Sequence, residues 1–164
     1  MKKKFLLFCL VGFLAIPAFA DHPTNKIGLG LFAGGGFGSV AGFNPGVSLK
    51  FPNLPVYWGI NASIGGGTVG LSVSGDYYLI DQNLVKIGSS NLGWFLGLGA
   101  FTHIYFGNST SFALGARLPI GLSWQINRTF ELFMDVVPGI GVGFNRGSLF
   151  YFVGAGELGL RLWI

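Results

Sequence analysis

Phe112-Ala-Leu-Gly-Ala-Arg-Leu-Pro-Ile-Gly-Leu-Ser-Trp-Gln-Ile126 is the stretch of sequence that decides the fold. Every second residue from Phe112 to Ile126 is apolar, whereas the residues between them are mostly small or polar and include Arg117. Alternation with a period of two is typical of a β-strand, because successive side chains point to opposite faces of a sheet. The stretch therefore predicts one long strand with an apolar face and a face of small and polar residues.

The same alternation recurs along the chain and predicts eight strands. They span residues 26–34, 45–52, 55–65, 68–80, 92–106, 111–126, 129–144 and 149–164. The Gly- and Asn-rich stretches between them are typical of hairpin turns, with two longer connections at 35–44 and 81–91. Pro119 and Pro138 fall inside strands, where the missing N–H group predicts a bulge.

Composition favours a membrane barrel over a water-soluble sheet. The 164 residues suit one domain, and only 10% of them are charged, against about 25% in average globular proteins. The polar faces carry Gly, Ser and Asn rather than Lys and Glu, which suits a narrow lumen more than a wet surface. The sequence therefore predicts an all-β, eight-stranded, antiparallel, up-and-down transmembrane β-barrel with its aliphatic face on lipid. A soluble secreted sandwich is the alternative that alternation alone leaves open.

The first twenty residues have the three parts of a secretory signal peptide. Lys2–Lys4 are basic, Phe5–Ile16 is apolar, and Ala18-Phe19-Ala20 matches a cleavage site. We expect residues 1–20 to be cleaved and residues 21–164 to form the barrel. Three of the ten basic residues and the single cysteine, Cys9, leave with this segment. Seven basic residues then face six acidic ones, so we expect neither disulfides nor a nucleic-acid interface.

Aromatic residues gather at the predicted strand ends. An even number of strands places both termini on the same side, which we expect to be the periplasm. That rim would carry all four tryptophans, Trp58, Trp94, Trp124 and Trp163. The opposite rim would carry Phe106, Phe112, Phe144 and Phe150. Two aromatic girdles are typical of outer-membrane barrels, because amphipathic rings favour the membrane interface.

The mature chain resembles the small outer-membrane barrels of the OmpA, OmpX and OmpW type, and a spirochaetal OmpA-like family in particular. The resemblance rests on the signal peptide, the eight strands, the segment Asp76–Gly99 and the terminal Glu157-Leu-Gly-Leu-Arg-Leu-Trp-Ile164. It implies the outer membrane of a Gram-negative-type envelope, contact with outer-membrane lipids, and insertion by the barrel-assembly machinery. We expect a monomer.

Charged residues on the lumen face suggest an internal network. Antiparallel register across the last hairpin places Glu131 opposite Arg161 and Asp135 opposite Glu157. Arg117 lies at nearly the same level as Asp135, so we expect Arg117 to bridge Asp135 and Glu157, and Arg161 to pair with Glu131. Buried charges must be paired. We favour a structural plug that locks the barrel, and a gate for small solutes is the functional alternative.

His103 is the candidate residue at the lumen mouth, where we expect it to face inward beside Phe101 and Tyr105. A catalytic histidine would need an orienting carboxylate, and the sequence predicts none at that level. No His/Cys spacing indicates a metal site, and we expect no cofactor.

The sequence leaves three functions open. We favour a non-enzymatic barrel with a structural or passive role, at most a narrow pore. The first alternative is an OmpW-like channel for small apolar molecules. The second is a lipid-modifying outer-membrane enzyme that uses His103.

Overall fold

A computed structural model describes residues 22–39, 41–65, 68–107, 109–144 and 149–164. The expected signal peptide lies outside these residues. In the part of the chain that is described, no helix is long and apolar enough to cross a membrane.

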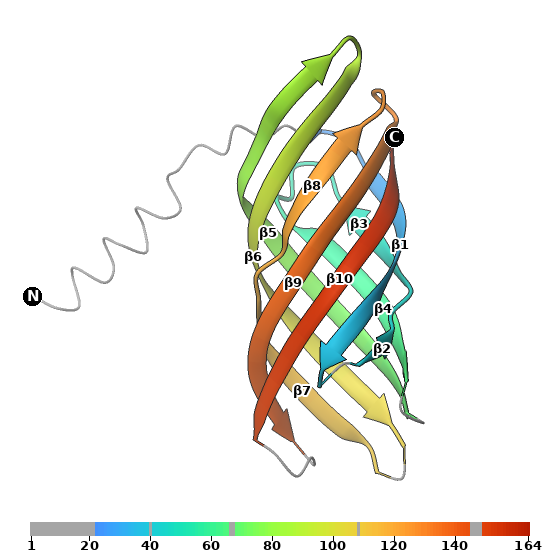
Figure 1. Cartoon of the computed structure of the whole chain (residues 1–164), viewed down its shortest axis with the longest axis vertical. Coiled ribbons are helices and arrows are strands. Elements are labelled where there is room, and N and C mark those ends of the chain that lie inside the picture. Colours follow the sequence, from blue (N-terminus) through green and yellow to red (C-terminus); the bar gives the residue numbers. More distant parts are fainter. Residues whose placement is uncertain (1–21, 40, 66–67, 108, 145–148) are drawn as a thin grey trace, which may run out of the picture.

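The described residues fold into a barrel of antiparallel strands that are tilted relative to the long axis of the barrel (Figure 1). The strands are β1 (Gly28–Gly38), β2 (Gly42–Phe43), β3 (Gly46–Lys50), β4 (Tyr57–Gly65), β5 (Thr68–Ile87), β6 (Ser90–Phe106), β7 (Ser111–Arg117), β8 (Ile120–Gln125), β9 (Phe130–Phe144) and β10 (Phe150–Trp163). Consecutive strands pair along the chain, except β2 with β3 and β7 with β8, and β10 returns to pair with β1, which closes the sheet.

The ten segments make eight strands of the barrel, because two of these strands are interrupted. β2 and β3 are the two parts of one strand, since both pair with β1 and β4. β7 and β8 are the two parts of another, which lies between β6 and β9. The prediction of an eight-stranded antiparallel up-and-down barrel is therefore confirmed. Closure leaves no sheet edge within the ring, which is the condition for a sheet to cross lipid.

The expected bulges at Pro119 and Pro138 are wrong. Arg117 pairs with Gly139 and Ile120 pairs with Val136, so the register is the same on both sides of the interruption. Both prolines still accept hydrogen bonds, from Gly97 N–H at 2.8 Å and Leu118 N–H at 2.9 Å. Each proline removes one donor from the ladder without adding a residue, so the strands stay in register.

The bulges lie in β5 instead. Its register with β6 shifts between Tyr78 and Ile80 and again between Asn83 and Val85. The expected long loop at 81–91 is also wrong, because Ile87 pairs with Ser90 across a short turn whose Gly88 has a φ of 62°. The hairpin of β5 and β6 extends beyond the other strands at the end of the barrel where the C-terminus lies (Figure 1).

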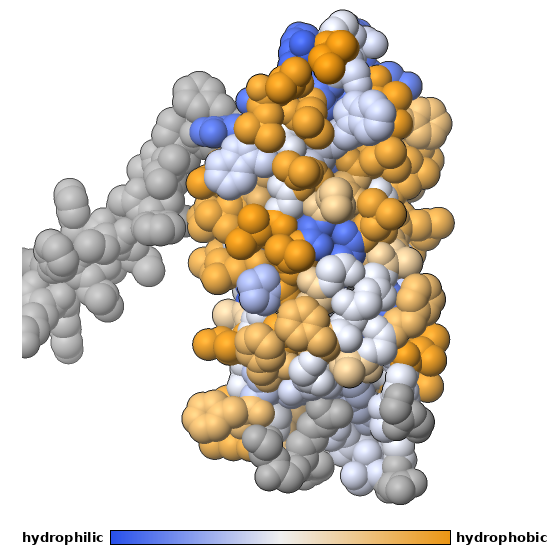
Figure 2. Space-filling model, in the orientation of Figure 1, coloured by the Kyte–Doolittle hydropathy of each residue, from blue (hydrophilic) through white to orange (hydrophobic). Residues whose placement is uncertain are grey.

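Side chains alternate between wall and lumen as the sequence predicts. On β7, Leu114 is 43% exposed while its neighbour Ala113 is completely buried. One face of the wall is mostly hydrophobic in Figure 2. The apolar residues that would form the core of a sandwich therefore lie on the outside, where a barrel needs them against lipid.

Glycines test this alternation, because they occur on both faces. Gly121 points into the lumen, where an added Cβ would overlap the carbonyl oxygen of Met134 and lie 2.7 Å from Asp135 Cβ. Gly156 points outward, and an added Cβ there meets nothing within 4 Å.

We expect Gly121→Ala to lower the free energy of unfolding by about 1–3 kcal/mol, because it overpacks the lumen. Gly156→Ala is the matched control and should change it by less than about 0.5 kcal/mol. Urea unfolding in lipid vesicles measures both, and equal effects would contradict the assignment of the two faces.

Candidate functional site

Glu131 is the centre of a buried hydrogen-bonded network near the C-terminal end of the lumen. Register places it opposite Arg161, whose NH1 lies 2.8 Å from Glu131 Oε1. Trp163 Nε1 donates to Glu131 Oε2 at 2.6 Å, and His22 Nε2 lies 3.0 Å from Oε1. The Glu131 side chain is completely buried. The structure thus brings Glu131 and Arg161 together as expected, and adds two partners that the sequence did not indicate.

His22 inserts into the lumen from the segment that precedes β1. Its Nδ1 lies 2.7 Å from Asp81 Oδ1, and its backbone N–H donates to Asp81 Oδ2 at 3.3 Å. Around it, the ring of Tyr78 stacks on Tyr57 with centroids 4.0 Å apart and on Phe95 at 4.5 Å. Sequence reasoning missed His22 because it lies outside any alternating segment, and missed Asp81 because 81–91 was expected to be a loop.

Arg161 is held by more than its carboxylate partner. Its NH2 donates to Ser48 Oγ at 3.1 Å, so β3 is joined to β10 across β1. Its guanidinium lies 4.6 Å from the Phe133 ring centroid and 4.9 Å from that of Tyr57. Aromatic faces attract a cation. These contacts tie strands on different sides of the barrel to one buried charge.

Arg117 makes a different ion pair from the expected one. Its Nε lies 3.0 Å from Asp76 Oδ1, and in the described residues no other carboxylate oxygen lies within ion-pair distance of it. Asp135 and Glu157 are cross-strand neighbours as predicted, but the expected bridge from Arg117 to both of them is wrong. Asp76 shares the inward face of β5, so alternation could have identified it. Distance along the barrel axis could not be judged from sequence.

The lumen around Arg117 holds little free space. A cavity of about 30 Å³ lies beside Asp76, Asp135 and Glu157, and one of about 20 Å³ lies between Glu157 and His103. Each has room for at most two or three water molecules, since one water needs about 10–15 Å³ of such space. Water in these cavities would supply the hydrogen bonds that Asp135 lacks from protein atoms.

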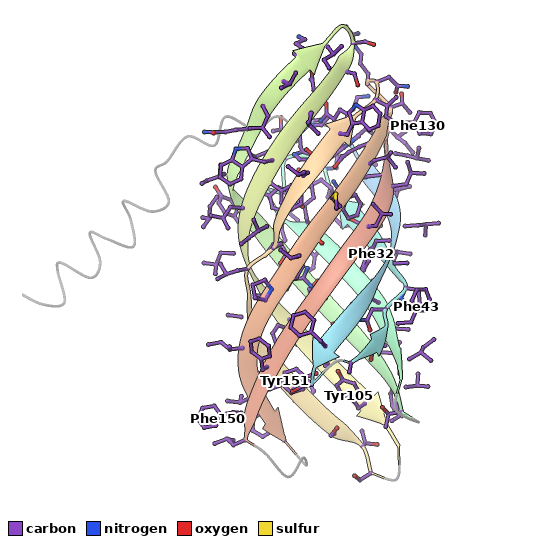
Figure 3. The ribbon with its side chains drawn as sticks, viewed as in Figure 1. Phe32, Phe43, Tyr105, Phe130, Phe150 and Tyr151 are labelled. Atoms are coloured by element: carbon purple, nitrogen blue, oxygen red, sulfur yellow. The ribbon has the colours of Figure 1, made fainter. Side chains whose placement is uncertain are left out.

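Tyr105 and Tyr151 lie at the other end of the barrel (Figure 3). His103 forms a hydrogen-bonded cluster with them. Its Nδ1 lies 2.7 Å from the Tyr151 hydroxyl oxygen, which lies 2.6 Å from the Tyr105 hydroxyl oxygen. Phe101 packs beside them, with its ring centroid 4.9 Å from that of His103. His103 faces inward next to Phe101 and Tyr105, as the sequence predicts, and Tyr151 is the partner that the sequence did not indicate.

Trp163 does not belong to the outer aromatic girdle. It is only 1% exposed and points into the lumen, whereas Trp58 and Trp124 lie on the outer wall. The alternation of β10 explains this, because Trp163 shares a face with Glu157, Gly159 and Arg161. The hydrogen bond from its indole to Glu131 replaces the interfacial contacts that a girdle residue would make.

No protein-family model matches the chain, and neither does any curated protein. Among solved structures, the N-terminal β-barrel domain of OprF from Pseudomonas aeruginosa matches with a TM-score of 0.54 and 11% identity, over 87% of this chain and all of that domain. The fold is that of an outer-membrane β-barrel. Neisserial surface protein A matches with a TM-score of 0.47 and 14% identity, over 84% of this chain and 95% of that one. A designed protein, TMB2.3, matches with a TM-score of 0.42 and 14% identity, over 87% and 98%.

The pKa of His22 makes the stability of the network dependent on pH. Burial by itself lowers this pKa, but the carboxylates of Glu131 and Asp81 outweigh burial and raise it from 6.5 to about 9. A group whose pKa is raised on folding stabilises the fold fully below its unfolded pKa. That contribution is lost as pH rises through the folded pKa.

We therefore expect His22→Gln to be less stable than the parent protein at pH 6.5, by up to roughly 3 kcal/mol at about 1.4 kcal/mol per pKa unit. The difference should shrink as pH rises through about 9, because the parent then loses the proton on His22. Urea unfolding of both proteins in lipid vesicles at a series of pH values measures it. A difference that stays constant across this range would show that the charge of His22 contributes nothing.

Proposed function

We propose that the protein resides in the outer membrane as a closed barrel with a structural role, and that both of its termini lie on the periplasmic side. Outer-membrane lipids would contact its apolar wall, and the barrel-assembly machinery would insert it. We further propose that it acts as a monomer. The OprF barrel domain shares the fold, and the resemblance of the mature sequence to small outer-membrane barrels supports the location.

The proposed structural role rests on the side chains that fill the lumen. Three layers of inward side chains cross it: the Glu131 network, the Arg117–Asp76 pair, and the cluster of His103, Tyr105 and Tyr151. The cavities beside Arg117, about 30 and 20 Å³, have room for a few water molecules and for nothing larger. This filling favours a plug over a channel for small apolar molecules.

The contacts of His103 favour a structural residue over a catalytic one. A histidine that activates a nucleophile is usually oriented by a carboxylate. Here the hydrogen-bond partners of the imidazole Nδ1 are the hydroxyl groups of Tyr151 and Tyr105. We propose that this cluster closes the end of the barrel opposite the C-terminus and that the protein is not an enzyme.

Two measurements test the proposed function. We expect the protein to fractionate with the outer membrane and to change its mobility on a gel only after boiling, as folded barrels do. We also expect no stepwise conductance in planar lipid bilayers, because side chains fill the lumen around Arg117 and leave cavities of only about 30 and 20 Å³ there. Discrete conductance steps from purified folded protein would contradict the closed lumen, and recovery in aqueous fractions without detergent would contradict the location.

A further inference from the structure

A larger cavity, about 190 Å³, lies at the end of the lumen where the C-terminus lies. The cavity exists because β4 is shorter than β5 at this end. The hydrogen-bonded ladder between the two strands ends at the pair Tyr57–Asp76, whereas β5 continues to Ile87. Pro55 lies where β4 would extend further, and it has no N–H group to donate to β5. The chain before β4 therefore leaves β5, and the gap between them is the cavity.

The cavity has a buried cation on its wall. Lys50 is 4% exposed, and its Nζ donates to the carbonyl oxygen of Phe51 at 2.8 Å. In the described part of the chain, no carboxylate oxygen lies within 4 Å of this ammonium group. An ammonium group has three donors, and buried cations are normally paired with an anion. Lys50 is therefore built to accept an anion from the cavity.

The surrounding charges favour an anion as well. Asp81 also lines the cavity, but its carboxylate is paired with His22 at 2.7 Å. Among the described residues, three cations, Lys50, His22 and Arg161, lie at this end of the lumen together with two carboxylates, Asp81 and Glu131. An anion that enters the cavity thus balances an excess positive charge.

The rest of the cavity lining is mostly apolar, although it includes Thr24 and Asn53. The stacked rings of Tyr57 and Tyr78 line the cavity together with Leu54 and Pro55. A mostly apolar cavity in which one charged group, Lys50, has no ion-pair partner among the described residues selects a ligand with an apolar body and one complementary charged group. The lining residues Tyr57, Tyr78 and Lys50 point toward the lumen rather than the wall, so the ligand reaches them from the aqueous mouth.

We propose that this cavity binds a small organic acid whose carboxylate contacts Lys50 Nζ and whose apolar chain packs on Tyr57, Tyr78 and Leu54. Binding at the mouth goes beyond the structural role and does not depend on whether the lumen is closed.

Hexanoate is the probe that tests this proposal. The folded full chain in phosphocholine nanodiscs is titrated by calorimetry with hexanoate, with the uncharged hexan-1-ol, and with hexylammonium. We expect saturable binding of hexanoate and about tenfold weaker binding of the other two, because a charge-assisted hydrogen bond is lost. Tighter binding of sn-glycerol 3-phosphate than of hexanoate would indicate the phosphate of a lipid headgroup and would overturn the proposal of a carboxylate.

Variants locate the binding. Lys50→Met keeps the apolar stem and should weaken hexanoate binding about tenfold. Lys86→Met is the matched control, because Lys86 is exposed on the β5–β6 hairpin outside the cavity, and binding should not change. Leu54 lies at the edge of the cavity, and Leu54→Glu tests the site independently if Lys50→Met does not fold. The introduced carboxylate should repel the carboxylate of hexanoate. Absence of saturable binding, or binding that survives both cavity variants, would overturn the proposal.

Discussion

Glu131→Ala is expected to lower the free energy of unfolding by about 3–5 kcal/mol. The carboxylate of Glu131 contacts Arg161 at 2.8 Å, His22 at 3.0 Å and the Trp163 indole at 2.6 Å. Its removal leaves a buried guanidinium without its carboxylate and leaves the indole N–H without an acceptor. Removing one partner of a buried pair costs more than the pair itself contributes, because the remaining charge is still dehydrated.

The prediction is measured by urea unfolding in lipid vesicles and by the temperature at which the gel mobility shift occurs. Glu131→Gln keeps the shape and one acceptor oxygen, so it should destabilise the barrel less than Glu131→Ala does. Met134→Ala, on the lipid-facing side of the same strand, is the control for a general effect of shortening a side chain on β9. Equal stability of Glu131→Ala and the parent would show that the network does not hold the barrel together.

Arg117→Ala should lower the free energy of unfolding by about 2–3 kcal/mol at neutral pH. The cost is below that of Glu131→Ala because the side chains of Arg117 and Asp76 remain 12% and 9% exposed, so water screens the charges that are left. In the variant, Asp76, Asp135 and Glu157 still line one small cavity, while Arg161, the other described cation in its lining, is already paired with Glu131. Like charges at such distances repel each other.

Low pH should reduce the difference in the free energy of unfolding between Arg117→Ala and the parent protein. Protonation of the carboxylates at low pH removes the repulsion in the variant and the ion pair in the parent. Arg128→Ala is the matched control, because Arg128 lies exposed in the turn between β8 and β9 and should leave stability within about 0.5 kcal/mol. Unchanged melting of Arg117→Ala would contradict a structural role for the Arg117–Asp76 pair.

Sequence reasoning placed the pairs that lie on one hairpin. Glu131 with Arg161, and Asp135 with Glu157, follow from counting residues on either side of one turn. It failed for Arg117, whose partner Asp76 lies on β5, because β6 separates β5 from β7. Which inward side chains meet across a lumen depends on the shear of the closed barrel, and local alternation does not specify that shear.

The two errors on tryptophan and proline have different causes. The position of Trp163 could have been predicted from the face it shares with Arg161, so alternation was a better guide than the preference of tryptophan for interfaces. The bulges could not have been located, because β5 carries both of them without a proline or glycine at either register shift. They accommodate pairing with β6 over almost the whole hairpin, which is a property of two strands together.

The sequence by itself determined the closed antiparallel barrel and the face of the residues in strands that alternate strictly, because alternation acts locally and lipid requires every backbone group to be paired. Only the tertiary structure decided that His22 inserts into the lumen, packs against Trp163 and hydrogen-bonds to Asp81 and Glu131, and that a cavity opens beside Lys50. These contacts join residues from the segment before β1 and from β3, β5 and β9. They arise where closure of the barrel brings side chains that are distant in sequence into one dehydrated space, in which each charge needs an ion-pair or hydrogen-bond partner.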